Sequence, residues 1–336
     1  MWSTLELVKK HLSLAITLSM GAALLVGWQV DTRPLRALVV PLTIGMVLPM
    51  MVAINPRVLL FRCAPKVQLT TQYLNFVLIP LVGWGVGLLF FRDQPMVALG
   101  LLLVSLFPTS GMTVSWTGFA RGNIAMATKM SVVGMLLGSL LAPFYVKLLL
   151  GASVSIPLAK MFVQIGWVVG FPLLLGLALR ALLVRTLGSP RFAAQVAPKL
   201  PTLSAVVMLA LVFTAVSLKA DMLRDPTLLL SLLPALLLFY AAVFALGLLV
   251  GRRFPRGDGI AMVYSTAVRK VSLALALAVT TFGEDGAIAA VALAVALLLQ
   301  VQLAAASLRV VGWVFGPAEA RDESVGERAG STLAAG

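Results

Sequence analysis

Long apolar stretches, separated by short segments rich in proline, glycine or basic residues, recur along the whole chain. A stretch of about twenty apolar residues is long enough to cross a hydrocarbon core of about 30 Å as an α-helix. Ten stretches of this kind fall at residues 11–30, 37–54, 68–91, 95–120, 124–150, 157–183, 200–218, 227–250, 259–282 and 286–315. The pattern therefore predicts an all-α polytopic membrane protein with about ten transmembrane helices.

The fourth stretch is interrupted by a polar, helix-breaking segment. Pro108 removes a backbone donor, while Thr109, Ser110 and Gly111 supply hydroxyl groups and a flexible turn. At membrane depth such backbone is tolerated only where it is buried in protein or lines a cavity. We therefore expect a solute-binding site at this break. The alternative is a proline kink repaired by neighbouring hydroxyl groups.

The ninth stretch carries a second polar segment, YSTAVRKVS, at residues 264–272. Its position in the second half of the chain matches that of the first break in the first half. Five spans in each half, an odd number, give the two halves opposite orientations in the membrane. We therefore predict two inverted repeats, residues 1–150 and 157–316, with broken fourth and ninth helices. The polar residues 317–336 are expected to form a disordered cytoplasmic tail.

Composition supports a membrane setting, because 60% of the residues are hydrophobic, 11% are charged and the mean hydropathy is +1.04. Of the 26 basic residues, sixteen fall on one side of the predicted spans and three within spans, while seven fall on the other side: Arg33, Arg36, Arg92, Lys147, Lys160, Lys219 and Arg224. This bias places both termini in the cytoplasm, in what we expect to be a bacterial inner membrane. The net charge of +14 then reflects topology and attraction to anionic membrane lipids, and does not indicate nucleic-acid binding.

The three basic residues inside spans are Lys129, Arg269 and Lys270, whereas all twelve acidic residues lie at span ends, in loops or in the tail. Intramembrane charges are rare and usually functional. An interior with basic and no acidic groups favours an anion as the transported solute. The alternatives are a Lys129 that extends to the membrane interface, and packing roles for Arg269 and Lys270 in which carbonyl groups satisfy the charge.

Other chemistries lack the residues that they need. Cys63 and His11 are the single cysteine and histidine, so neither a disulfide nor a metal site is expected. No histidine or carboxylate lies at depth to activate Ser110 or Ser115, which argues against an enzyme. No phosphate-binding loop is present, and we expect no cofactor.

Several segments resemble the bile acid:sodium symporter superfamily, which includes an arsenite-permease branch. The segments are PLTIGMVLPMMVAINP (41–56), LNFVLIPL (74–81), WTGFARGN (116–123), LLAPF (140–144) and SLALALAVTTFG (272–283). The resemblance implies ten spans, two inverted repeats, and broken fourth and ninth helices that cross near the midplane. The LNF-x-x-x-P and W-x-x-x-ARGN features favour the arsenite branch.

The chain also departs from this resemblance. The arsenite branch has a cysteine where Thr109 stands and a glutamate near residues 270–272, and this chain has neither. The sodium-coupled branch has a Ser-Asn pair where Thr113 and Val114 stand here, a Ser at Ala127 and a Thr at Ser131. It also has a Glu near Ser265 and a Gln near Arg269. Only Thr113 and Ser131 keep suitable oxygens, so the usual sodium sites are incomplete. Lys129 is level with Val114 across the intervening turn and could replace the sodium ion, loading and releasing a proton.

We therefore predict a secondary transporter, a symporter or antiporter, that moves a small, anionic solute through a midplane site by alternating access. The predicted solute-binding residues are Asn75, Pro108, Thr109, Ser110, Gly111, Thr113, Ser265, Thr266, Arg269 and Lys270. A second set of residues is predicted to bind the coupling ion, H⁺ or Na⁺, or to supply a side chain that replaces it. These residues are Thr113, Thr128, Lys129 and Ser131. Arsenite efflux is the alternative function, a membrane sensor or enzyme is a more distant one, and no pattern specifies an oligomeric state.

Overall fold

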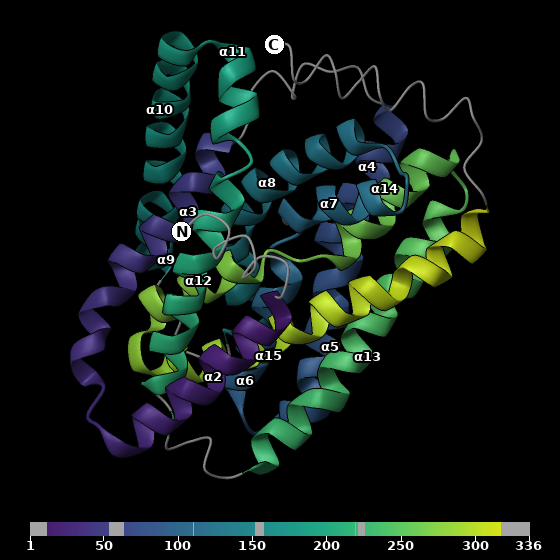
Figure 1. Ribbon diagram of the computed structural model, residues 1–336. Coiled ribbons are helices and arrows are strands. Elements are labelled where there is room, and N and C mark those ends of the chain that lie inside the picture. The colour runs from purple at the N-terminus through teal and green to yellow at the C-terminus, as the bar shows by residue number, and fades with distance from the viewer. Residues whose placement is uncertain are drawn as a thin grey trace.

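The computed structural model describes residues 12–53, 64–109, 111–151, 158–218, 220 and 226–316, and every regular element in these ranges is a helix (Figure 1). His11, Cys63, Ser110 and the predicted tail at 317–336 lie outside the described residues. Eight helical segments are long and apolar enough to cross a membrane: Arg33–Ala53, Pro65–Phe91, Ile124–Leu150, Leu158–Leu187, Leu200–Ser217, Leu230–Gly251, Arg256–Gly283 and Asp285–Phe315. The chain is therefore an integral membrane protein.

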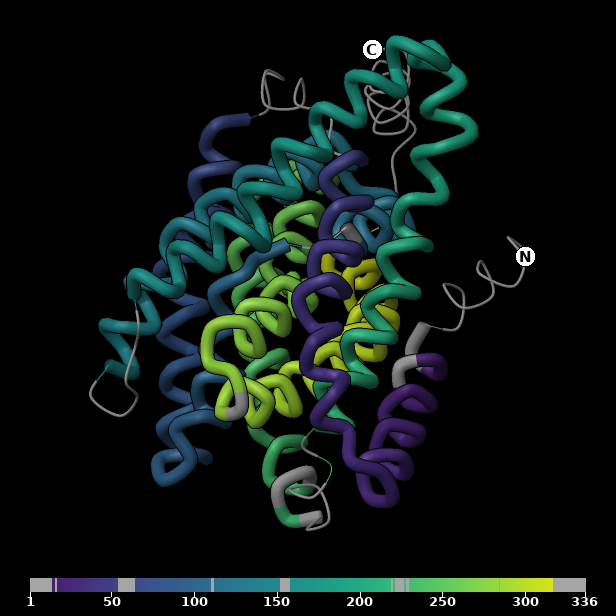
Figure 2. The backbone as a smooth tube through the Cα atoms, turned by 90° about the vertical axis from the view of Figure 1, so that its left-hand side faces the viewer, coloured from purple at the N-terminus to yellow at the C-terminus, as the bar shows by residue number. Residues whose placement is uncertain are grey.

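One group of helices, which we call the panel, comes from the start of the predicted first half and from the start of the second. Its members are α2 (Leu12–Gln29), α3 (Val39–Ala53) with the 3₁₀ turn η1 (Arg33–Leu38), α9 (Leu158–Ile165), the π-helical turn η4 (Gly166–Gly170), α10 (Phe171–Leu187) and α12 (Leu200–Ser217). α12 packs against α2 and α3, and α3 packs against α10; Figure 2 shows the purple α2 and α3 beside the teal α12. Between α10 and α12 lie the short α11 (Ser189–Arg191) and η5 (Phe192–Val196).

Close packing within the panel depends on glycine. A Cβ atom at Gly176 of α10 would lie 2.6 Å from the Cβ of Met51 and 2.9 Å from the backbone nitrogen of Val52. Small residues of this kind let membrane helices approach closely enough for van der Waals packing to hold them together.

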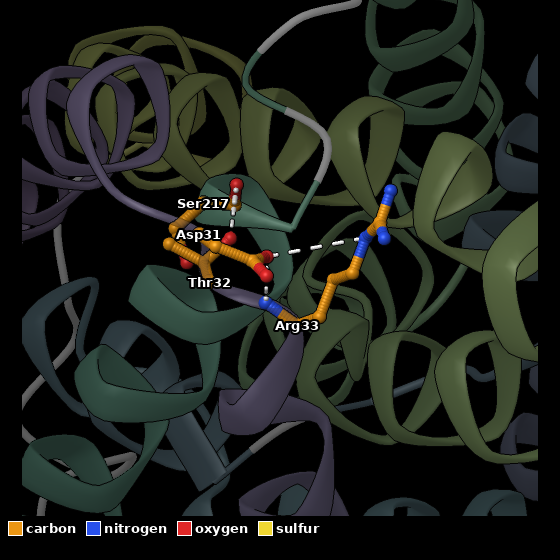
Figure 3. A network of polar contacts seen from close by, with 4 residues as sticks. All are labelled: Asp31, Thr32, Arg33 and Ser217. Carbon is orange, nitrogen blue, oxygen red and sulfur yellow. Dashed lines mark hydrogen bonds and ion pairs between the residues drawn. The ribbon is translucent and has the colours of Figure 1, made fainter.

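A polar network fastens the turn between α2 and η1 to the end of α12 (Figure 3). The hydroxyl of Thr32 donates to the Ser217 carbonyl at 3.0 Å, and the backbone nitrogen of Arg33 donates to Asp31 Oδ1 at 3.0 Å. The Arg33–Asp31 ion pair, at 3.9 Å, is largely exposed and adds little stability. The buried Thr32 bond, together with the bond from Trp28 Nε1 to the Ala220 carbonyl at 2.7 Å, therefore fixes this end of the panel.

The second group, which we call the core bundle, contains the remaining long helices. Its members are α4 (Pro65–Tyr73), the π-helical turn η3 (Leu74–Leu78), α5 (Ile79–Phe91), α6 (Pro95–Leu106), α7 (Gly111–Phe119), α8 (Ile124–Leu150), α13 (Pro226–Gly251), α14 (Arg256–Ala267) and α15 (Val271–Phe315). α15 bends sharply at Gly283, whose φ of 60° and ψ of −121° are not helical. Both predicted halves of the chain contribute to both groups, so residues 1–150 and 157–316 do not pack as separate units.

The turn between α7 and α8 is bound to the start of α14. Asn123 accepts a bond from the Met126 backbone nitrogen at 3.0 Å, which caps α8, and its own backbone nitrogen donates to the Gly257 carbonyl at 2.9 Å. Arg256 donates to the Arg121 carbonyl at 2.8 Å and to the Gly316 carbonyl at 3.2 Å. These bonds hold the starts of α8 and α14 and the end of α15 together at one surface of the core bundle.

Candidate functional site

The predicted break at Pro108 is present, and its backbone is unusual. α6 ends at Leu106, Phe107 has a ψ of 85°, and α7 begins at Gly111. Thr109 has a φ of 59°, which is rare for a β-branched residue and persists only where surrounding packing enforces it. Its hydroxyl is directed to the carbonyls of Pro108, at 2.7 Å, and Ser131, at 3.2 Å.

Two glycines of α8 form the surface on which this break packs. A Cβ atom at Gly138 would lie 2.9 Å from the Leu106 carbonyl oxygen and 3.1 Å from Pro108 Cδ. A Cβ atom at Gly134 would lie 3.1 Å from Pro108 Cγ. The break therefore fits against α8 because these positions lack side chains.

The second break spans residues 268–270, between the end of α14 and the start of α15. The backbone nitrogen of Lys270 donates to the carbonyl of Phe107 at 2.8 Å, which joins the two breaks directly. The hydroxyl of Thr113 lies 3.4 Å from the carbonyl oxygens of both Tyr264 and Val268. The two interrupted helices therefore contact each other at their non-helical segments.

Arg269 is fully buried at this crossing, and its guanidinium group is bound to oxygen atoms on three elements. Nε donates to the Val104 carbonyl at 3.1 Å, and one terminal nitrogen donates to the Thr266 carbonyl at 3.0 Å and to Asn75 Oδ1 at 2.6 Å. The other terminal nitrogen donates to the Ser105 carbonyl. The last carbonyls of a helix lack intrahelical partners and carry partial negative charge. Arg269 therefore binds the C-terminal ends of both α6 and α14.

Gln300 lies on the part of α15 that follows the bend at Gly283, and its side chain bonds to both the N–H and the C=O of Arg269. Its Oε1 accepts from the Arg269 nitrogen at 2.7 Å, and its Nε2 donates to the Arg269 carbonyl at 3.1 Å. The hydroxyl of Tyr240 donates to the same Gln300 oxygen at 3.3 Å. The sequence analysis missed both residues, although an amide within the apolar run of α15 is the kind of signal that identified Asn75.

Replacement of Gln300 by leucine should destabilise the crossing. The Arg269 N–H and C=O groups would lose their partners, and each buried unpaired group costs about 1–3 kcal/mol. We expect Gln300→Leu to lower the thermal midpoint of purified protein in detergent by several degrees. Gln302→Leu, an exposed position on the same helix, is the matched control and should lower the midpoint much less than Gln300→Leu. Equal midpoints for the two variants would contradict the role assigned to Gln300.

Lys270 differs from Arg269 because its charge has no strong acceptor among the described residues. The residue is 7% exposed, and its Nζ lies 3.3 Å from Met135 Sδ. A thioether is only a weak acceptor. Within the described ranges, no acidic side chain forms an ion pair with it. Among the described residues, the buried ammonium therefore finds no group that replaces the water removed from it by burial.

An apolar void adjoins this part of the crossing. It is too narrow to admit a water molecule in this arrangement, and it is lined by Phe107, Ile165, Val168, Val169, Leu273 and Leu277. Phe107 is the residue that accepts the Lys270 backbone bond, and Leu273 follows Lys270 by one helical turn. Ile165 and the two valines belong to α9 and η4, so the void lies between the panel and the core bundle.

The structure brings seven of the predicted solute-binding residues together: Asn75, Thr109, Thr113, Ser265, Thr266, Arg269 and Lys270. Pro108 and Gly111 form the break itself, and Ser110 lies outside the described residues.

The two α14 hydroxyls differ. Ser265 Oγ is buried without a partner in the described part of the chain, whereas the Thr266 hydroxyl bonds to the Met262 and Val263 carbonyls within its own helix.

The predicted coupling residues on α8 are more dispersed. Ser131 contributes its carbonyl to Thr109, while its hydroxyl donates to Ala127 within the helix. The Thr128 hydroxyl donates to the Ile124 carbonyl and is exposed. Lys129 is partly exposed, and at about 100° per residue it lies roughly opposite the Gly138 face that packs on the break. Lys129 therefore lies on a different face of α8 from the glycines that pack on the break.

Within the described residues, no group of three or more His, Cys, Asp or Glu side chains lies together in a way that could hold a metal ion. The polar groups that converge are instead carbonyls, the amides of Asn75 and Gln300, hydroxyls and two basic side chains.

These features define a helical membrane protein with two broken helices that cross around buried cations. The family model described as "Sodium Bile acid symporter family" matches residues 40–226, more than half of the chain. The chain therefore belongs to this family, which indicates a membrane transporter of solutes. It is also 26% identical over 246 residues to the "Uncharacterized protein YbaS" of Bacillus subtilis (strain 168), a match that covers 72% of this chain and 77% of that protein.

Proposed function

We propose that the protein is a secondary transporter that carries a small anion across a bacterial inner membrane, with both termini in the cytoplasm. The observation that carries this proposal is the buried Lys270 ammonium, which lies at the crossing of two helix breaks and has only a thioether sulfur as acceptor among the described residues. A solute carboxylate or oxyanion would supply the missing charge. A charge-assisted hydrogen bond of this kind is short and about twice as strong as a neutral one.

The contacts of the two basic residues divide their roles. An arginine can bind a carboxylate or oxyanion through two donors, but four donor bonds of Arg269 already go to protein oxygens. Lys270 has no comparable set of acceptors and lies near the apolar void beside Phe107 and Leu273. We therefore assign solute charge recognition to Lys270, and an apolar part of an organic anion to the void.

The two helix groups supply a basis for alternating access. The void lies between the panel and the core bundle, so a displacement of one group relative to the other would open it. The predicted inverted repeats at residues 1–150 and 157–316 would give such a motion two equivalent end states. In this proposal the core bundle carries the crossing, and the panel forms the opposing wall.

Arg269 also bears on ion coupling. The oxygens that surround it, three carbonyls and the Asn75 amide, are the kind of ligands that hard cations take in proteins. A guanidinium group already occupies that environment, so we propose that transport does not require sodium. A proton exchanged at Lys129 remains the alternative means of coupling.

Anion binding to purified protein is the first test of the proposed function. A ligand that binds the folded state raises the thermal midpoint by mass action. The probes are lactate, succinate, taurocholate and sulfate, each as its potassium and sodium salt, and neutral glycerol is the control. We expect at least one anion to raise the midpoint equally with either cation. No shift with any anion, together with a shift by sodium alone, would contradict the proposal.

Arsenite efflux is the second candidate, because two sequence features resemble that branch of the superfamily. Thr109 stands where the branch has a cysteine, and a hydroxyl does not replace a thiol as a ligand for arsenic. We expect that cells without their own arsenite pump gain no resistance from this protein. Resistance that is retained in Cys63→Ser would show that no thiol is needed and would make arsenite the leading substrate.

A further inference from the structure

One face of α4 carries amide groups that the proposed transport site does not use. The side-chain nitrogen and oxygen atoms of Gln68 and Gln72 are all buried, and none has a hydrogen-bond partner among the residues that the structure describes. Both residues belong to the membrane-spanning segment Pro65–Phe91. A buried group left unpaired costs about 1–3 kcal/mol, so these amides are a large uncompensated cost in the present arrangement.

The two glutamines and Asn75 share one face of the helix. They occupy positions i, i+4 and i+7, and a rise of 1.5 Å per residue separates the first from the last by about 10 Å. The lipid-facing side carries Leu69 and Tyr73, which are 69% and 56% exposed. We call the face of Gln68, Gln72 and Asn75 the amide stripe.

The amide stripe connects one membrane surface with the crossing. At its deep end, Asn75 accepts a bond from Arg269 and donates to the Ser265 carbonyl at 3.3 Å. At its outer end, Val67 packs in one apolar cluster with Met126 and Ala261, near the starts of α8 and α14. The stripe therefore runs from the surface where these three helices begin to Arg269.

A further unpaired group lies at the deep end. Ser265 is fully buried, and its hydroxyl has no hydrogen-bond partner in the described part of the chain. Its backbone carbonyl accepts the Asn75 amide, which places Ser265 beside the end of the stripe. Unpaired amides and a hydroxyl in succession are the kind of polar groups that buried water satisfies, at about three hydrogen bonds per water molecule.

We propose that the amide stripe lines a narrow hydrated path within the core bundle, from the membrane surface at the start of α4 to Arg269. Its occupant is water, which pairs the amides of Gln68 and Gln72 and the hydroxyl of Ser265. The path is separate from the void between panel and core bundle, and in the proposed topology it opens to the cytoplasm. Its importance for transport, but not its hydration, rests on the proposed function.

Thiol accessibility tests the path directly. Cys63→Ser removes the single cysteine, and Gln68→Cys, Gln72→Cys and the matched lipid-facing controls Leu69→Cys and Tyr73→Cys are then made one at a time. The probe is methanethiosulfonate ethyltrimethylammonium, a permanently charged cation that does not cross the bilayer, applied to each side of oriented membrane vesicles. We expect the cysteines of Gln68→Cys and Gln72→Cys to react at least ten times faster than those of their controls. This faster reaction is expected only when the probe is applied to the membrane surface at which α4 begins. Reaction rates equal to those of the controls would overturn the proposal.

Leucine substitution separates hydration from packing by a different measurement. If water pairs Gln72, Gln72→Leu removes a hydrated amide, and it should lower transport several-fold while the thermal midpoint stays the same or rises. A variant with a lower midpoint and unchanged transport would mean that the amide has a packing role, and would also overturn the proposal. Because thiol reaction needs neither solute nor flux, failure of the proposed transport function would leave the accessibility result intact.

Discussion

Arg269→Met is expected to abolish transport and to lower the thermal stability of the protein more than any other single substitution at the crossing. It would leave the carbonyls of Val104, Ser105 and Thr266 and the amide oxygen of Asn75 without their donors. Unpaired buried acceptors cost about 1–3 kcal/mol each, so we expect a loss of about 3 kcal/mol or more. The measurements are solute flux in proteoliposomes and the thermal midpoint in detergent.

Two comparisons make this prediction specific. Arg92→Met, at an exposed position, is the matched control and should preserve both flux and midpoint. Arg269→Lys keeps the charge but lacks the planar fork of five donors, so it should restore only part of the stability. An Arg269→Met protein with normal flux and a normal midpoint would show that the guanidinium group does not hold the crossing.

Lys270→Met is expected to impair transport, as Arg269→Met does. Unlike Arg269→Met, it is expected to preserve or raise the thermal stability. A methionine would pack beside Met135 without the cost of a buried charge, so the thermal midpoint should stay the same or rise. Loss of a hydrogen bond to a charged group is worth about 1.5–3 kcal/mol, which corresponds to about 10- to 100-fold weaker anion binding. Isothermal titration with the best anion from the thermal screen measures this change.

The matched control for Lys270→Met is Lys147→Met, because Lys147 is exposed near the end of α8. It should bind the anion as the parent protein does. Lys270→Arg retains a positive charge and should retain part of the affinity. If Lys270→Met binds every anion as tightly as the parent, then Lys270 is a packing residue and the assigned site is wrong.

The membrane class and the first break could be predicted because they depend on local sequence. Hydrophobic length indicated the spans, and Pro108 removes a backbone donor wherever the chain places it. The partition into panel and core bundle could not be predicted in this way, because it depends on which helices pack together across the chain. α12, for example, packs against α2 and α3, which lie far earlier in the sequence.

The site was predicted in its residues but only partly in their roles. An arginine in an apolar helix has the same sequence signal whether it binds a solute or the ends of neighbouring helices, and here Arg269 bonds to helix ends. Lys129 has the same signal, but its helical face directs it away from the break. Gln300 was missed because its partner is the backbone of Arg269, and Tyr240 was missed because its hydroxyl bonds to Gln300. No pattern of side chains along the sequence specifies either contact.

Anion flux into proteoliposomes in the absence of sodium tests the central claim most directly. Purified protein is reconstituted with potassium as the sole alkali cation, and uptake of a labelled anion identified by the thermal screen is compared with uptake under an imposed sodium gradient. An imposed proton gradient forms a third arm, with Lys129→Ala as its control. We predict saturable uptake that is equal with and without sodium and that falls about 10- to 100-fold in Lys270→Met at low anion concentration. Uptake that requires sodium and persists in Lys270→Met would contradict the account.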